Sequence, residues 1–294
     1  MTTQVKKRKS SLCEQCSGLH YLLTNKKGSL KAKPCRCFHC KICDGSGRVF
    51  TEDNIGRSSV NSCECMEFHK RLRMLSACGI PSKFKEATFD SFKTSAKNSE
   101  RSKNYAKTVA MDFVKNFGND DRGLVLSGEP GLGKTHLAAA IIKKLIMEKG
   151  ADCKFVDFFQ LLSDIRHGYS QDVSELSHIL PYLQSRVLVI DELAKGRNSD
   201  WEHAILDQVI SYRYNTNDKT TIYTSNYNDR ENETKKIDSK IVDTRKEDFS
   251  ARFANETLES RVGPRIFSRM IETCDFLHLE GDDFRQTHKT LHHL

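Results

Sequence analysis

The sequence predicts an α/β fold, in which a parallel sheet is flanked by helices and preceded by a small cysteine-rich module. Three observations lead to this prediction. The run GEPGLGKT at 128–135 fits the phosphate-binding pattern G-x-x-x-x-G-K-[ST]. Strand-like and helix-like patterns alternate from residue 104 onward. Eight of the eleven cysteines precede residue 66, in pairs whose spacing suits zinc.

The chain has 294 residues, of which 37% are hydrophobic, enough for one core of about 150 to 200 residues and a smaller unit. We expect a zinc-binding module at 1–73 that contacts a partner, a linker at 74–103 and a nucleotide-binding domain at 104–294. No apolar stretch approaches the roughly 18 residues that span a bilayer, and no apolar core follows the basic N-terminus. We therefore expect a cytoplasmic protein with no membrane partner.

Positive charge is concentrated near the N-terminus. Residues 1–73 hold 15 Lys and Arg against 6 Asp and Glu, whereas the rest of the chain holds 32 against 33. Two zinc sites of four thiolates would each carry about −2, leaving about +5 on this segment. Weak nucleic-acid contact is compatible with this charge, and the basic run KKRK at 6–9 reads as a solvated tail.

The cysteines form an internal repeat, in which a CxxC pair is followed by a CxC pair. The spacer between the pairs is 18 residues in the first unit and 19 in the second. Each unit can bring four thiolates to one tetrahedral metal, so we expect two structural zinc sites. The first unit comprises Cys13, Cys16, Cys35 and Cys37, and the second comprises Cys40, Cys43, Cys63 and Cys65.

Other uses of these cysteines stay open from sequence alone. The density of cysteines at 35–43 also allows the two metals to be interleaved, with His39 or His69 replacing a thiolate. Disulfides are disfavoured in the reducing compartment that the lack of a secretion signal indicates, and an iron–sulfur cluster is a further alternative. Cys78, Cys153 and Cys274 are expected to be ordinary buried thiols.

Half of the cysteine-rich module of DnaJ-type co-chaperones resembles the CxxCxGxG run at 40–47. The chain has no His-Pro-Asp tripeptide, so we do not expect a co-chaperone. A zinc module with few apolar residues depends on its metal for a core, which favours a role in presenting a surface to a partner.

The phosphate-binding run lies between a strand pattern at 123–127 and a helix pattern that begins at Thr135. Its backbone amides can converge on phosphate oxygens, while Lys134 adds a positive charge and the Thr135 hydroxyl ligates Mg²⁺. We therefore expect ATP and Mg²⁺ as cofactors. The expected nucleotide-binding residues are Gly128, Glu129, Pro130, Gly131, Leu132, Gly133, Lys134, Thr135, the adjoining His136, and Asp191.

Further strands are predicted near 154–156, at 187–190 and at 221–224, with helices from Phe158 and Glu202. Ligands of open α/β sheets bind at the carboxyl ends of the parallel strands, and the strand at 187–190 ends in Asp191-Glu192. We expect Asp191 to hold Mg²⁺ through its water shell and Glu192 to orient and partly deprotonate the attacking water.

Two other features at the predicted site have structural alternatives. Asn226 follows the next strand and is expected to hydrogen-bond the γ-phosphate or the attacking water, because it falls at the same sheet edge, although a turn-forming Asn is the alternative. Arg265 and Arg269 lie one turn apart after a Gly-Pro break, and either stabilise transferring phosphate, in cis or in trans, or bond local acids such as Glu272. Before the domain, Phe84, Phe89 and Phe92 are expected to dock the linker.

From Phe68 to Arg285 the chain resembles the AAA+ ATPases of the DnaC/DnaI/IstB group. The resemblance rests on GIP at 79–81 with Phe84 and TF at 88–89, the loop at 128–135, VIDE at 189–192, YRY at 212–214 with TSN at 224–226, and GPRIFSRM at 263–270 running into LEGDDFR at 279–285. It implies that Lys134 and Thr135 are Walker A residues, Asp191 and Glu192 Walker B, Asn226 sensor 1, and Arg269, with Arg265 beside it, the arginine finger.

The resemblance also implies a function. A cysteine-rich N-terminus is similar to the helicase-binding domain of DnaI-type loaders, although the doubled array departs from a single-zinc pattern. The first hypothesis is an ATP-dependent loader that contacts a hexameric replicative helicase, single-stranded DNA and further copies of itself. The alternatives are an IstB-type transposition helper ATPase, or a zinc adaptor that uses ATP binding as a switch. The charged segment 228–256 is longer than is usual in the group, and its role is unexplained.

Overall fold

The computed structural model describes residues 13–94, 100–119, 122–169, 175–216, 218–229 and 256–284. The tail at 6–9, residue 285 and most of the charged segment 228–256 therefore lie outside the described residues. Two compact units emerge, of which the first comprises 1–77 with 81–85 and the second 78–80 with 86–294. None of the described helices is both long and apolar enough to cross a bilayer.

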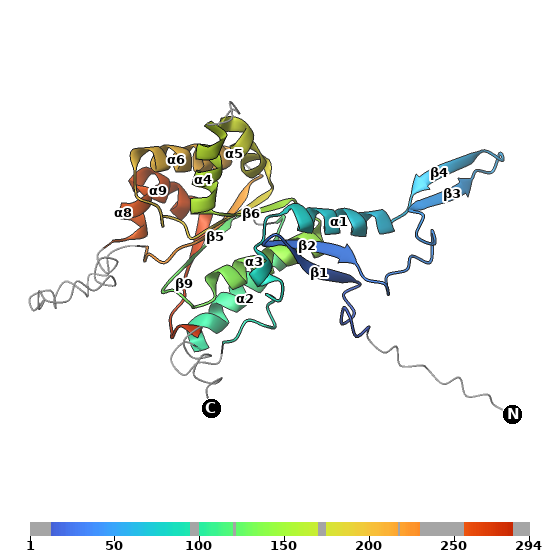
Figure 1. The fold of residues 1–294 in the computed structure, drawn as a ribbon, viewed down its shortest axis with the longest axis horizontal. Helices are drawn as coiled ribbons and strands as arrows, with labels where there is room; N and C mark the ends of the chain where they lie inside the picture. Colours follow the sequence, from blue (N-terminus) through green and yellow to red (C-terminus); the bar gives the residue numbers. More distant parts are fainter. Residues whose placement is uncertain are drawn as a thin grey trace, which may run out of the picture. The chain divides into compact units, whose positions relative to one another are not determined.

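Unit 1 is built from two antiparallel hairpins and one helix (Figure 1). Helix α1 packs against β2, and Leu30, Leu72 and Leu75 are buried at 3% exposure or less. This apolar contact is small, which fits a module that depends on bound metal for stability. Its elements are β1 (Tyr21–Lys26), β2 (Ser29–Pro34), β3 (Arg48–Glu52), β4 (Ser58–Ser62), α1 (Cys65–Ala77) and the short η1 (Ser82–Phe84).

Unit 2 contains a parallel five-stranded sheet in the order β6-β7-β8-β5-β9. The strands are β5 (Gly123–Ser127), β6 (Cys153–Asp157), β7 (Val187–Asp191), β8 (Thr220–Thr224) and β9 (Cys274–His278). The four strands predicted from sequence are confirmed, and β9 is an addition that the alternation did not reveal. Strands β5, β7 and β8 are buried along their whole length, as expected for a sheet covered on both faces.

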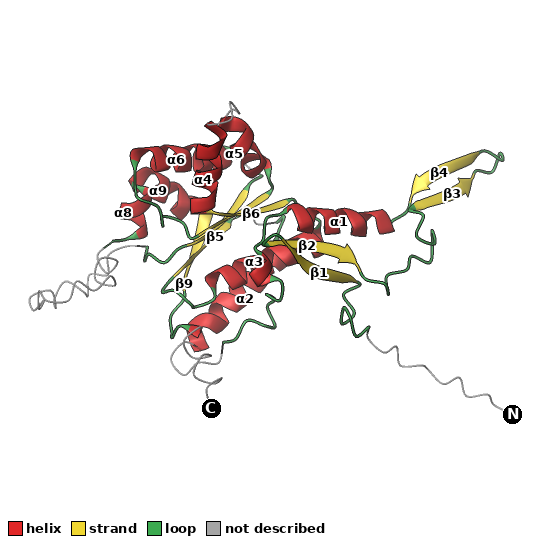
Figure 2. Cartoon of the chain, in the orientation of Figure 1, coloured by secondary structure: helices red, strands yellow, loops and turns green. Residues whose placement is uncertain are grey.

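Helices cover both faces of this sheet (Figure 2). Helices α2 and α3 lie on one side, and α4, α5, α6, α8 and α9 lie on the other, where their apolar side chains form one cluster with those of the strands. The helices are α2 (Glu100–Asn116), α3 (Lys134–Lys144) continued by η2 (Leu145–Lys149), α4 (Phe158–Tyr169), α5 (Glu175–Gln184), α6 (Asp200–Tyr214), α8 (Leu258–Val262) and α9 (Pro264–Thr273).

Helical structure extends into the expected linker, since α1 ends at Ala77 and α2 begins at Glu100. Within unit 2, Phe89 and Phe92 are each 5% exposed, so this part of the segment docks through aromatic side chains. Phe84 belongs to unit 1 and is half-buried. The proposed divisions after residues 73 and 103 stay predictions.

Candidate nucleotide-binding and metal-binding sites

The phosphate-binding run connects β5 to α3, as the sequence predicts. Gly133 adopts φ +94° at the N-cap of α3, and a Cβ atom there would lie 2.7 Å from the Phe92 ring. Gly131 adopts φ +82°, and a Cβ atom there would overlap the Asp283 carboxylate. Both positions require glycine because of backbone conformation and close approach.

Lys134 is drawn into this loop by backbone carbonyls. Its ammonium group donates to the carbonyl oxygens of Gly128 at 2.6 Å and Glu129 at 2.8 Å, and the residue is only 6% exposed. A buried ammonium needs such acceptors because desolvation of a charge is costly. Phosphate oxygens that entered the loop would offer it stronger, charged acceptors.

Three side chains from separate elements converge at the carboxyl edge of the sheet. Thr135 Oγ1 donates to Asp191 Oδ1 at 2.8 Å, and Thr224 Oγ1 donates to the same oxygen at 2.6 Å. Thr135 and Asp191 are thus adjacent, as a shared Mg²⁺ ligand set requires. Thr224, which is 1% exposed at the end of β8, was missed by sequence reasoning, although its place beside the end of β7 is a usable signal.

The Asp191 carboxyl is 6% exposed, and burial raises its pKa above the usual value. The neighbouring carboxylates of Glu192 and Asp157 add to the rise, while the hydrogen bonds from Thr224 and Thr135 oppose it. A buried carboxylate whose charge is incompletely compensated is suited to a divalent cation, which would restore its ionised form.

Glu192 begins the turn that follows β7, in a left-handed backbone conformation with φ +54°. Its amide donates to Thr224 Oγ1 at 2.9 Å, which fixes the turn against β8. Its carboxylate forms an ion pair with Lys195, and this hydrogen bond raises the pKa of Lys195. Glu192 is therefore beside Asp191, but one of its carboxylate oxygens is engaged by a lysine.

Asn226 follows β8 with an exposed side chain. Among the described residues its side chain forms no hydrogen bond, with Asp191 and Glu192 included. Its role as sensor 1 stays a prediction.

The two arginines of α9 differ sharply in environment. Arg269 donates to Asp207 Oδ1 at 2.9 Å and to Ser211, and its side chain is 18% exposed. Arg265 is 73% exposed and approaches Asp207 only to 3.8 Å. Within the described part of the chain, neither contacts the phosphate-binding loop or Asp191. Bonding to a local acid is thus present, but the acid is Asp207 of α6 rather than Glu272.

His136, the first residue after the loop, anchors the segment that precedes α2. Its Nε2 lies 3.0 Å from the Thr88 carbonyl oxygen and 3.2 Å from Ser91 Oγ, and its ring packs at 5.7 Å from that of Phe92. Burial lowers the pKa of His136, which favours its neutral form. His136 therefore joins this segment to the phosphate-binding loop.

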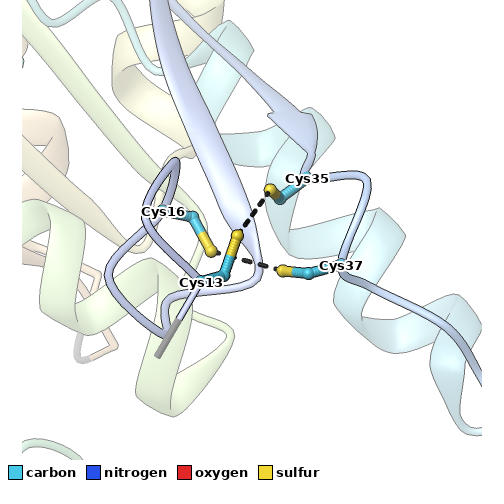
Figure 3. Close-up of side chains that lie close together, drawn as sticks. All are labelled: Cys13, Cys16, Cys35 and Cys37. Carbon is cyan, nitrogen blue, oxygen red and sulfur yellow. Dashed lines mark hydrogen bonds between the residues drawn. The ribbon is translucent and has the colours of Figure 1, made fainter. Parts of the chain in front are cut away.

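The eight N-terminal thiols fall into two groups of four. Within each group all sulfur atoms lie within 4.8 Å of one another. Figure 3 shows the first group, Cys13, Cys16, Cys35 and Cys37, in which the sulfurs of two pairs are separated by 3.8 and 3.3 Å. In the second group, Cys40, Cys43, Cys63 and Cys65, the matching separations are 3.6 and 3.4 Å.

These separations suit a tetrahedral metal site. Four sulfurs at about 2.3 Å from a central Zn²⁺ lie about 3.8 Å apart, whereas a disulfide needs about 2.05 Å. The groups coincide with the two repeat units, so the interleaved arrangement does not occur, and neither His39 nor His69 belongs to a group. Cys78, Cys153 and Cys274 are buried, as expected.

Comparisons with known proteins agree with this geometry. A family model described as IstB-like ATP binding protein matches residues 66–292. The chain belongs to the IstB-like ATP-binding protein family. The chain is also similar to DnaC in sequence and in structure, so the resemblance seen in the sequence is confirmed, as is the P-loop AAA+ fold.

Relatives of this IstB-like chain include a protein of a phage-like element, XkdC of Bacillus subtilis, which is 26% identical over 204 residues, 67% of this chain and 74% of XkdC. The chain is 30% identical to YqaM of Bacillus subtilis over 178 residues, 57% of this chain and 56% of YqaM. It is 24% identical to the replicative helicase loader DnaC of Escherichia coli over 175 residues, 59% of this chain and 69% of DnaC. A crystal structure of the DnaC helicase loader superposes with a TM-score of 0.53 and 30% identity, covering 67% of this chain and 99% of that one.

Proposed function

We propose that this protein is an ATP-dependent loader of a replicative helicase. The observation that carries the proposal is the convergence of Thr135, Asp191 and Thr224 beside the phosphate-binding loop, in a chain similar to DnaC over most of the DnaC length. The paired threonine and aspartate are the ligand types that Mg²⁺ uses with a nucleoside triphosphate.

The residues at the sheet edge have distinct roles in the proposed ATP hydrolysis. The loop amides and Lys134 bind the phosphates, and Thr135 with Asp191 would hold Mg²⁺, which neutralises charge on the β- and γ-phosphates when bound. Glu192 orients the attacking water and accepts its proton. Thr224 positions both acids, because it donates to the carboxylate of Asp191 and accepts the amide of Glu192.

The remaining proposed partners lie outside this site. Residues 1–73, holding two Zn²⁺ ions, contact the hexameric helicase, while the ATPase domains contact single-stranded DNA and one another. Arg265 and Arg269 act on the nucleotide of a neighbouring copy. The exposure of Arg265 supports a role in trans.

An IstB-type transposition helper is the second candidate, and the family model that matches the chain favours it. The two candidates differ in partner and share the ATPase chemistry. Binding of a hexameric helicase supports the loader, whereas stimulation of a transposase supports the helper.

ATP turnover of the full chain, with and without a single-stranded oligonucleotide and a hexameric helicase, tests the proposal. Lys134→Ala should abolish ATP binding, while Glu192→Gln should bind ATP and lose turnover by about 100-fold or more. Glu148→Gln, on the exposed end of η2, is the matched control and should behave as wild type. ATP binding without turnover in the wild type would leave only a nucleotide switch.

A further inference from the structure

Unit 1 has a groove between β2 and α1 that neither zinc group uses. Its volume is about 350 Å³, and the two elements lie side by side (Figure 1). The floor is apolar and comprises Leu72 and Ala77 from α1 with Ala32 and Pro34 from β2.

The rim of the groove is cationic. Lys31 and Lys33 line it from β2, and Arg73 lines it from α1 together with the imidazole of His69. No acidic residue lines the groove. Among the described residues, none of the three permanent cations has an ion-pair partner; Lys31 donates only to the Ser76 carbonyl oxygen, at 2.6 Å.

The acidic residue of α1 that lies nearest to Arg73 in sequence already forms ion pairs with other residues. Glu67 pairs with Lys70 at 3.8 Å and with Arg71 at 3.4 Å, and neither of these cations lines the groove. The rim charges are therefore left uncompensated by the helix that carries Arg73. Such a concentration of one charge sign favours a ligand of the opposite sign.

The groove is unsuited to pairing with an added strand. Ser76 Oγ accepts a hydrogen bond from the Ala32 amide at 2.9 Å and donates one to the Ala32 carbonyl oxygen at 3.2 Å. The backbone groups of Ala32, in the middle of β2, are therefore not available to an added strand. Pro34 has no amide to offer further along. Recognition must therefore rest on side chains.

We propose that this groove binds an acidic amphipathic helix of a partner protein. The residues of α1 that line it, from His69 to Ala77, span about 12 Å, or two helical turns. Apolar side chains of the partner helix pack on Pro34 and Ala77, which are exposed. Its carboxylates meet Lys33 and Arg73 on the rim. The apolar floor favours protein over nucleic acid, whose backbone would use only the cations.

This inference deepens the proposed partner-binding role of residues 1–73 and rests on it. It is tested with the full zinc-loaded chain and three fluorescein-labelled probes: a 16-residue helical peptide of Glu, Leu and Ala, the same peptide with Lys in place of Glu, and the oligonucleotide dT16. Fluorescence anisotropy measures each affinity. ATP hydrolysis is measured separately on the same samples.

The decisive variant combines Lys33→Glu with Arg73→Glu, and its matched control combines Lys26→Glu with Lys27→Glu at the exposed turn between β1 and β2. The control changes net charge equally. We expect the groove variant to lose at least tenfold in affinity for the acidic peptide and the control less than threefold, with the Lys peptide unbound by wild type.

Three outcomes would overturn the inference. These are no binding of the acidic peptide, equal losses in both variants, or a tenfold loss of dT16 affinity confined to the groove variant, which would assign the groove to nucleic acid. Circular dichroism confirms that both variants fold. The ATPase measurement distinguishes failure of the proposed function from failure of the groove proposal. ATP turnover can be absent while the acidic peptide still binds, and the peptide can fail to bind while ATP is still hydrolysed.

Discussion

Thr224→Val provides a sharp test of the architecture at the sheet edge. Valine has nearly the volume of threonine, so packing is retained while two hydrogen bonds are lost. Loss of a donor to a buried carboxylate costs about 1.5 to 3 kcal/mol, and a buried amide without its acceptor costs about 1 to 3 kcal/mol. We expect the free energy of unfolding to fall by about 3 kcal/mol, or roughly 6 to 12 °C in Tm for a unit of this size.

The same substitution should alter chemistry as well as stability. The hydrogen bond from Thr224 lowers the pKa of Asp191, so its loss raises that pKa further above the usual value. We expect Thr224→Val to need more Mg²⁺ for hydrolysis and to lose activity at a higher pH on the acid side. Thr224→Ser, which keeps the hydroxyl, should retain both Mg²⁺ dependence and pH profile.

The pH dependence of unfolding has a defined sign. A carboxyl whose pKa is higher in the folded chain than in the unfolded chain destabilises the fold once pH rises from the unfolded value, about 3.9, through the folded value. Part of the loss of unfolding free energy in Thr224→Val comes from the ionised Asp191 carboxylate. This part should therefore shrink as pH falls toward about 4. Thermal unfolding at several pH values measures it. A valine variant as stable and active as wild type would refute the reasoning.

Three further predictions concern other residues and the metals. Lys195→Ala should raise basal ATP hydrolysis several-fold at unchanged ATP affinity, because Glu192 is freed from its ion pair. Lys195→Arg keeps the positive charge and should hydrolyse ATP at nearly the wild-type rate. An alanine variant that is slower than wild type contradicts this prediction. Arg265→Ala should lose the ATP hydrolysis that assembly stimulates and keep the wild-type Tm. Arg269→Ala should lose the same hydrolysis and also lower the free energy of unfolding by about 1 to 2 kcal/mol, because its hydrogen bond to Asp207 is lost. Thermal unfolding, together with ATP turnover at rising protein concentration, distinguishes the two variants. Metal analysis should find two zinc ions per chain, and a chelator should reduce the ordered structure of unit 1, seen by circular dichroism; visible absorption of an iron–sulfur cluster would argue otherwise.

The features that the sequence by itself determined are local ones. The glycines and lysine of the loop at 128–135 lie within eight residues, and the buried strand before Asp191 is one apolar run. The short spacings within the cysteine pairs likewise predict metal binding. Each of these patterns is set by backbone conformation or by neighbours in the chain, so it is readable without the fold.

Only the tertiary structure decided which distant side chains meet. Thr224 lies 33 residues from Asp191, and Asp207 lies 62 residues from Arg269, so their contacts depend on strand order and helix packing rather than on local pattern. Strand β9 pairs with β5 across some 150 residues. Sequence spacing cannot supply such pairings, because they are fixed by packing of the whole unit.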